Sequence, residues 1–545
     1  MKNRRTALTV ALSVGLANAL VIHQARAQAD PQTQQKIDAL QRQIDELKQA
    51  VERRAPASAA APAAGGHEFL ERKAGDGVTF FTRGGEVSIY GNLDVSFDYA
   101  TKGLKGMVGN NGPTDTPAGN GGWMPDISSN LSYVGVRGFQ TLGSSPTHFV
   151  YQLETQIDLA VTPGTPQSNS NQGERVGSAL VSRNSFIGLS APAWGAFKIG
   201  KTDAPYKIST ARMNPFVGMP GDYSVIMGNT GGDNRVEFGT RLSHAMWYES
   251  PNWGGVRFAA LFSPGQNRAD DSSNIPSGEP ECRGGNSPGS GNLPFGAATS
   301  PGSCSDGSFS NAYSTSLSWE GAGLYVTGAY EMHRKVNRTS DLVGGVSNPN
   351  AVPGLNGFDP NDVADESAWK VGVQYKFPTR TTVSGIWENM KRHLPGYLEP
   401  QDERTRTGFW LALSQDVTSA DSVHLGWAHA NKAKGDAGQH NPPASATPDP
   451  FLGFGFPNAD NRADMFTLAL KHAMDRNLSV YLDYATTRNK PFAHYDLGAG
   501  GRSVTTDCHD ASNTDVSGFD PHGGGPRCWT GGRLQAVSLG MNYRF

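Results

Sequence analysis

The chain has 545 residues, of which 37% are hydrophobic, and its formal net charge at pH 7 is -3. This near-neutral charge gives no reason to expect a nucleic acid as a partner. No apolar run beyond the first residues is long enough to cross a membrane as a helix, which excludes a helical membrane protein. The 67 glycines fit a protein with many turns between strands.

The N-terminus has the pattern of an export signal. Basic residues within the first five positions precede an apolar stretch at residues 7–22, and Ala25 and Ala27 form a small-x-small cleavage site. We therefore expect residues 1–27 to be a signal peptide and the protein to leave the cytoplasm.

Residues 31–54 follow with the spacing of an amphipathic helix. Its apolar positions lie three and four residues apart: Ile37, Leu40, Ile44, Leu47 and Val51. Roughly two and a half heptads are too few for a free-standing coiled coil, so we expect this short α-helical coil to pair only where a larger partner holds the chains together. Residues 55–84 begin with an Ala/Pro/Gly-rich stretch and are expected to be a linker.

Strand patterns begin after the linker and continue to the end of the chain. Between Val87 and Tyr99, odd positions are apolar (or Gly91) and most even positions are polar, which is the period of a β-strand. Similar segments are 133–139, 148–159, 181–189, 196–200, 242–248, 255–262, 313–319, 324–332, 369–377, 381–388, 407–413, 423–427, 466–470, 478–484 and the C-terminal strand ending at Phe545. This predicts about sixteen strands.

The connections between these segments alternate between short and long. Short turns on one side and long loops on the other are typical of an outer-membrane β-barrel, and an even strand number leaves both ends on the periplasmic side. A soluble sandwich and a β-propeller are the competing folds, but propeller blades recur at a fixed period that is absent here. We predict an all-β protein, a 16-stranded antiparallel transmembrane β-barrel over residues 85–545, preceded by the periplasmic coil.

Several motifs resemble those of the general Gram-negative porin family. They are Tyr90-Gly91-Asn92-Leu93-Asp94, residues 150–154, residues 186–201, Tyr248-Glu249-Ser250-Pro251 and the terminal Phe545. The resemblance implies a homotrimer in the outer membrane of a Gram-negative bacterium that lets small hydrophilic solutes or ions diffuse passively. The coil resembles that of dicarboxylate-type porins. Its Ile/Val and Leu pattern favours two strands, whereas the family is trimeric.

A sixteen-stranded barrel leaves a water-filled lumen whose charged side chains set selectivity. Alternation turns the bases Arg137, Lys198, Arg241 and Arg257 and the acids Asp94 and Glu154 inward. The resemblance implies that the third long loop, residues 201–240, folds into the lumen, with Asp222 as the candidate acidic residue. Arg183 matches a pore-lining family position, yet alternation groups it with the outward Ile187 and Leu189, so either a bulge intervenes or it lies above the hydrocarbon. The excess of bases predicts a preference for small anions, including carboxylates.

The four cysteines, Cys282, Cys304, Cys508 and Cys528, fit disulfides in an oxidising compartment. Three pairings are possible. We favour the one that joins neighbours in the sequence, Cys282 with Cys304 and Cys508 with Cys528. No histidine or cysteine spacing indicates a metal site, and no catalytic constellation or cofactor motif is evident, so we expect no enzyme. The alternative function is a structural tether or adhesin of the outer membrane, in which the coil reaches toward the cell wall.

Overall fold

The computed structural model describes residues 69–70, 77–101, 123–157, 159–160, 183–228, 238–264, 311–337, 363–393, 405–432, 460, 462–490, 493, 495, 497–498 and 533–545. The predicted signal peptide, the predicted coil and the four cysteines lie outside these residues, as does most of the predicted linker. No helix in the described part of the chain is long and apolar enough to cross a membrane.

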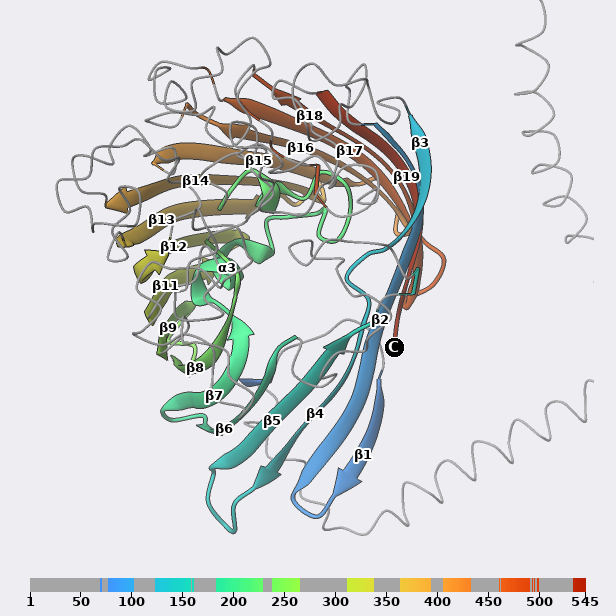
Figure 1. Ribbon diagram of the computed structural model, residues 1–545. Helices are drawn as coiled ribbons and strands as arrows, with labels where there is room; N and C mark the ends of the chain where they lie inside the picture. Colours follow the sequence, from blue (N-terminus) through green and yellow to red (C-terminus); the bar gives the residue numbers. More distant parts are fainter. Residues whose placement is uncertain are drawn as a thin grey trace, which may run out of the picture. The chain divides into compact units, whose positions relative to one another are not determined.

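Sixteen antiparallel strands form a closed ring, which confirms the predicted barrel (Figure 1). In order around the ring they are β2 (Gly85–Thr101), β4 (Tyr133–Thr141), β5 (His148–Gln156), β6 (Ser185–Ala191), β7 (Gly195–Asp203), β8 (Arg241–Glu249), β9 (Val256–Pro264), β11 (Asn311–Gly321), β12 (Leu324–Asn337), β13 (Val363–Lys376), β14 (Thr381–His393), β15 (Arg406–Asp416), β16 (Asp421–Ala430), β17 (Ala463–Ala473), β18 (Leu478–Asn489) and β19 (Arg533–Arg544). The ring closes where β19 pairs with β2, so each of the sixteen described strands has a partner on both sides.

Two short strands were not predicted. β1 (Val78–Thr82) forms a hairpin with β2 inside the segment expected to be linker. β3 (Met124–Ser129) pairs with the upper part of β2, and β4 pairs with its lower part, so β3 extends the same position in the ring. Between them Leu131 has a positive φ of 58° and interrupts the strand. The connection between the predicted strands 87–99 and 133–139 therefore contains a strand.

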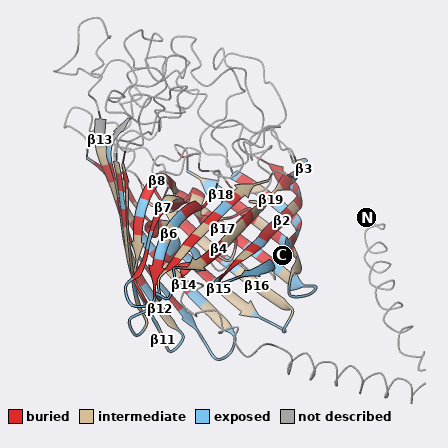
Figure 2. Ribbon diagram, turned by 90° about the horizontal axis from the view of Figure 1, so that it is seen from below, coloured by how far each residue is buried: buried red, intermediate tan, exposed pale blue. Residues whose placement is uncertain are grey.

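Buried residues alternate with exposed or half-buried ones along the strands (Figure 2), and the buried ones are those that the period places on the inner face. On β2 the inward Ser96 and Asp98 are at most 1% exposed, whereas the outward Phe97 is 54% exposed. On β19 the outward Leu539 is 60% exposed. Exposed apolar side chains on the outer surface and polar ones inside are the reverse of a soluble protein and match a barrel surrounded by lipid.

The described part of the connection between β7 and β8, residues 204–228 and 238–240, lies inside the ring of strands (Figure 1). We call these residues the constriction loop; they contain the helix α3 (Pro205–Ala211) and the 3-10 turn η2 (Tyr223–Val225). Pro205 starts α3 at a position where its missing N–H costs nothing. The helix packs against β11 and β12.

An apolar cluster joins the constriction loop to the barrel wall. Met213, Phe216 and Ile226 of the loop pack with Trp410 of β15 and Met465 of β17, and all five are at most 1% exposed. The rings of Phe216 and Trp410 meet edge to face at 5.9 Å. Burying each such side chain contributes about 1.5–3 kcal/mol, so the loop is a fixed part of the lumen wall.

Candidate pore constriction

Inward side chains of the wall hold the constriction loop at successive points along its length. Lys370 donates to Thr210 Oγ1 at 2.8 Å, Trp410 Nε1 to the Met213 carbonyl at 3.0 Å, and Lys471 to the Pro215 carbonyl at 2.5 Å.

Toward the end of the loop, the Gly228 N–H donates to Glu388 Oε1 at 2.7 Å, and Arg406 donates to the Ile226 carbonyl. These partners belong to β13, β14, β15 and β17. They satisfy backbone groups that burial would otherwise leave without hydrogen bonds.

Sequence reasoning missed these wall residues. Lys370 lies between the outward Trp369 and Val371, so the strand period did mark it as inward, whereas Arg406 lies between two threonines and carries no such signal. Their role in holding the loop was not visible, because their partners, the Thr210 hydroxyl and two backbone groups of the loop, are more than a hundred residues away in the sequence.

Asp222 lies in the constriction loop, as expected, but it serves the loop's own structure. Its carboxylate accepts the Ser224 N–H at 3.0 Å, capping η2, and the Asn214 side-chain amide at 2.8 Å. The neighbouring Tyr223 is buried and hydrogen-bonds with Thr210 Oγ1 at 2.9 Å. Burial raises the pKa of Tyr223 above its ordinary value, so this hydroxyl stays neutral at physiological pH.

The part of the wall on the opposite side of the ring from β13 carries a basic–aromatic cluster, which we define as Tyr90, Tyr133, Arg137, Glu154 and Arg183. The guanidinium of Arg137 lies 4.9 Å from the Tyr90 ring centre, and that of Arg183 lies 4.6 Å from the Tyr133 ring centre. Arg183 forms an ion pair with Glu154, which also accepts the Tyr90 hydroxyl at 3.1 Å. β2, β4, β5 and the segment just before β6 thus bring together three of the predicted residues, Arg137, Glu154 and Arg183.

The inward position of Arg183 has a simple cause. β6 begins at Ser185, so Arg183 precedes the strand and the alternation that placed it with Ile187 does not apply to it. Its N–H donates to the Glu154 carbonyl at 3.3 Å, which directs the side chain to the same wall as Glu154.

Asp94 faces inward on β2 but is part of a buried hydrogen-bond network. Its carboxylate accepts the Tyr481 hydroxyl and the Asn542 side-chain amide, each at 2.8 Å. Asn130, at the junction of β3 and β4, joins the same network through Tyr481 at 3.0 Å. Asp94 therefore fastens β18 and β19 to β2 across the closure of the barrel.

Lys198 faces inward and is paired with an acid. Arg241 is also paired with an acid, but the register between β7 and β8 shifts next to it and its neighbour Leu242 is the buried residue there, so the inward position of Arg241 stays a prediction. Lys198 contacts both oxygens of Glu249 at 2.8 and 2.9 Å and lies 4.8 Å from the Phe186 ring centre. Arg241 donates to Asn184 Oδ1 at 2.7 Å, and its Nη2 lies 3.2 Å from an oxygen of Asp203.

Arg257 lies at the turn end of β9, and its side chain is exposed. Its Cα is paired with that of Ser318, one of the inward residues of β11. Arg257 also adds positive potential near Glu320, which forms an ion pair with Arg212 of the constriction loop.

The lumen is thus lined by fixed charges of both signs and by aromatic rings. Within the described ranges, no group of three or more His, Cys, Asp or Glu side chains is arranged to hold a metal ion.

The profile of the family described as Gram-negative porin matches residues 55–491. The fold is similar to the anion-selective porin from Comamonas acidovorans, with a TM-score of 0.52, 15% identity and coverage of 85% of this chain and 100% of that one. For OmpT of Vibrio cholerae the TM-score is 0.46 and the identity 13%, with coverage of 86% of this chain and 99% of that one. For OmpF of Salmonella typhi the TM-score is 0.45 and the identity 13%, with coverage of 86% of this chain and 100% of that one. No curated protein sequence matches. The family match covers most of the chain, and we conclude that this protein belongs to the Gram-negative porin family.

Proposed function

We propose that the protein is an outer-membrane channel for passive diffusion of small hydrophilic solutes, and that it favours small anions. The constriction loop is the observation that carries the proposal, because it is held inside a barrel with a polar inner face. Solutes pass between this loop and the charged wall opposite, where no chemical step is required.

The anion preference rests on the number of bases around the lumen. Five bases face three acids among the predicted pore residues: Arg137, Arg183, Lys198, Arg241 and Arg257 against Asp94, Glu154 and Asp222. Three of these bases are paired with acids, Arg183 with Glu154, Lys198 with Glu249 and Arg241 with Asp203, whereas Asp94 and Asp222 are held by hydrogen bonds from uncharged donors. The proposed preference therefore depends mainly on Arg137 and Arg257. The name of the relative from Comamonas acidovorans, an anion-selective porin, agrees with this preference.

We expect the double variant Arg137→Ser/Arg257→Ser to lower the anion-to-cation permeability ratio roughly twofold or more, because both side chains add positive potential to the lumen. Reversal potentials across a KCl gradient measure this ratio. The matched control is Lys391→Ser/Arg488→Ser, which removes the same charge from the outer face, where Arg488 lies 5.2 Å from the Phe466 ring centre. Equal ratios in both double variants would contradict the assigned role of Arg137 and Arg257, and a clear cation preference of the native channel would overturn the anion preference.

We further propose that three copies assemble in the membrane, as the family resemblance implies, with the predicted coils joined at the periplasmic side. Conductance increments in bilayers that come in groups of three support this assembly, and single independent increments count against it.

A further inference from the structure

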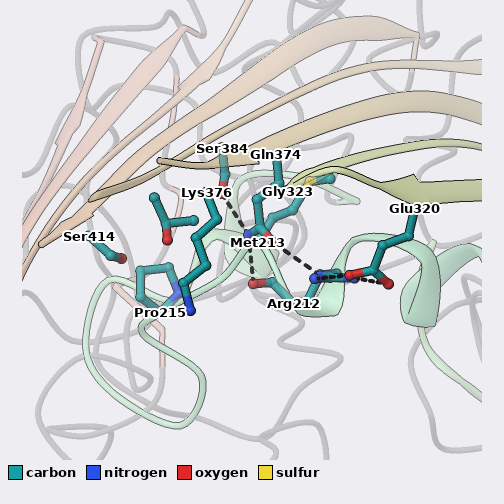
Figure 3. Close-up of a pocket in the computed structure, with 10 residues that line it drawn as sticks. Arg212, Met213, Pro215, Glu320, Gly323, Gln374, Lys376, Ser384 and Ser414 are labelled. Atoms are coloured by element: carbon teal, nitrogen blue, oxygen red, sulfur yellow. Dashed lines mark hydrogen bonds and ion pairs between the residues drawn. The ribbon is translucent and has the colours of Figure 1, made fainter. Parts of the chain in front are cut away.

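A cavity of about 390 Å³ lies between the constriction loop and the wall formed by β11 to β15 (Figure 3). Its lining residues are Arg212, Met213, Pro215, Glu320, Gly323, Gln374, Lys376, Thr382, Ser384 and Ser414. Gly323 belongs to a short turn, and Lys376 and Thr382 lie at strand ends next to another, so the cavity is on the periplasmic side of the loop. Its volume falls in the range of small-molecule sites, about 300–1,000 Å³.

Arg212, one of the two cations that line this cavity, is already paired with an acid. Arg212 contacts both oxygens of Glu320 at 2.9 Å and donates to Gln374 Oε1 at 3.0 Å. Its guanidinium also lies 4.4 Å from the ring centre of Tyr325. The pair of Arg212 and Glu320 is therefore neutral overall and fixes the edge of the cavity.

Lys376 is the second cation, and its charge is not balanced within the cavity. It lies two positions after the inward Gln374 on β13, so it is on the same inner face. Figure 3 shows its amine directed toward Pro215 of the loop. In the part of the chain that the structure describes, no carboxylate forms an ion pair with it. The cavity thus has one positive charge in excess.

Hydroxyl groups lie on the strands next to this charge. Ser384 Oγ accepts the Gln374 side-chain amide at 2.9 Å, so its own proton remains available to donate. Thr382 and Ser414 also line the cavity, and Ser414 Oγ lies 2.8 Å from His424 Nδ1. A cation beside hydroxyl donors is the donor set that a carboxylate accepts.

We propose that this cavity is a second solute site, on the periplasmic side of the constriction loop, where a small organic carboxylate binds briefly to Lys376 and Ser384. The inference rests on the proposed channel function and names a solute class for it. A binding site beyond the constriction loop raises the local concentration of anions there and so favours their passage, provided that binding stays weak enough for release.

The test is to add succinate to one side of the native trimer or monomer in a planar bilayer with KCl and to record interruptions of the single-channel current. Addition to the periplasmic side is expected to produce interruptions with a measurable residence time. In Lys376→Gln this residence time is expected to fall about fivefold, because one charge-assisted hydrogen bond is lost. Lys376→Arg keeps the charge and should retain most of the native residence time.

The matched control is Lys391→Gln, the same change on the outer face of β14, which should behave as the native channel does. Equal residence times in Lys376→Gln and the native channel would overturn the second site, as would an absence of interruptions in a native channel that conducts KCl. A native protein that conducts no KCl would instead overturn the proposed channel function.

Discussion

Replacing Gly221 with alanine is expected to lift the tip of the constriction loop from β17 and to raise the single-channel conductance roughly 1.5-fold or more. Gly221 has a φ of 81°, which alanine rarely adopts. A Cβ there would lie 2.0 Å from Thr467 Oγ1 and 2.5 Å from its Cγ2. The contact between the Thr467 hydroxyl and the Gly221 carbonyl, 3.3 Å, would also be lost.

A matched control separates the contact from backbone strain. Gly143→Ala places alanine at a similar φ of 61° in a short turn, where nothing lies within 4 Å of the added Cβ. It should leave the conductance unchanged. The double variant Gly221→Ala/Thr467→Gly removes the clashing atoms and should return the conductance toward the native value. Native conductance in Gly221→Ala itself would show that the loop tip does not limit the current.

Replacing Gly540 with alanine is expected to destabilise the closure of the barrel by about 2–4 kcal/mol, because overpacking is added to lost hydrogen bonds. The Tyr481 ring crosses β19 at this glycine, and a Cβ would lie 2.0 Å from its Cζ. Displacing the ring breaks its hydrogen bonds with Asp94 and Asn130. Heat-induced unfolding in detergent, followed by gel mobility, measures the loss.

Gly328→Ala is the control for Gly540→Ala. It makes the same change within β12, where the nearest atom to the added Cβ is 4.0 Å away. We expect its unfolding temperature to stay close to that of the native protein. Equal unfolding temperatures for the two variants would contradict a special role for the contact between Tyr481 and Gly540.

Strand positions followed from the sequence because the membrane and the lumen impose opposite solvents on alternate side chains. The segment from Val87 to Tyr99 and the last strand show this alternation without a break, and both are found in the ring. β3 escaped prediction because Met124 to Ser129 contains a proline and little apolar alternation. The positive φ of Leu131 interrupts the alternation between β3 and β4, so the sequence pattern does not show that both pair with β2.

The candidate site was predictable only in part, because alternation indicates the face on which a side chain lies but not the group that it contacts. Alternation places Arg137, Lys198 and Glu154 on the inner face, but it does not show that Glu154 neutralises Arg183. Contacts that fix the constriction loop join residues far apart, such as Pro215 and Lys471, which are 256 positions apart. They depend on the packed arrangement of the loop against the wall, which local patterns do not specify.

The single-channel current of the purified full-length protein in planar bilayers tests the central claim most directly. The account predicts discrete current steps whose conductance rises with KCl concentration, as a water-filled lumen requires. A protein that folds as a barrel in detergent, inserts into the bilayer and conducts no ions would contradict it.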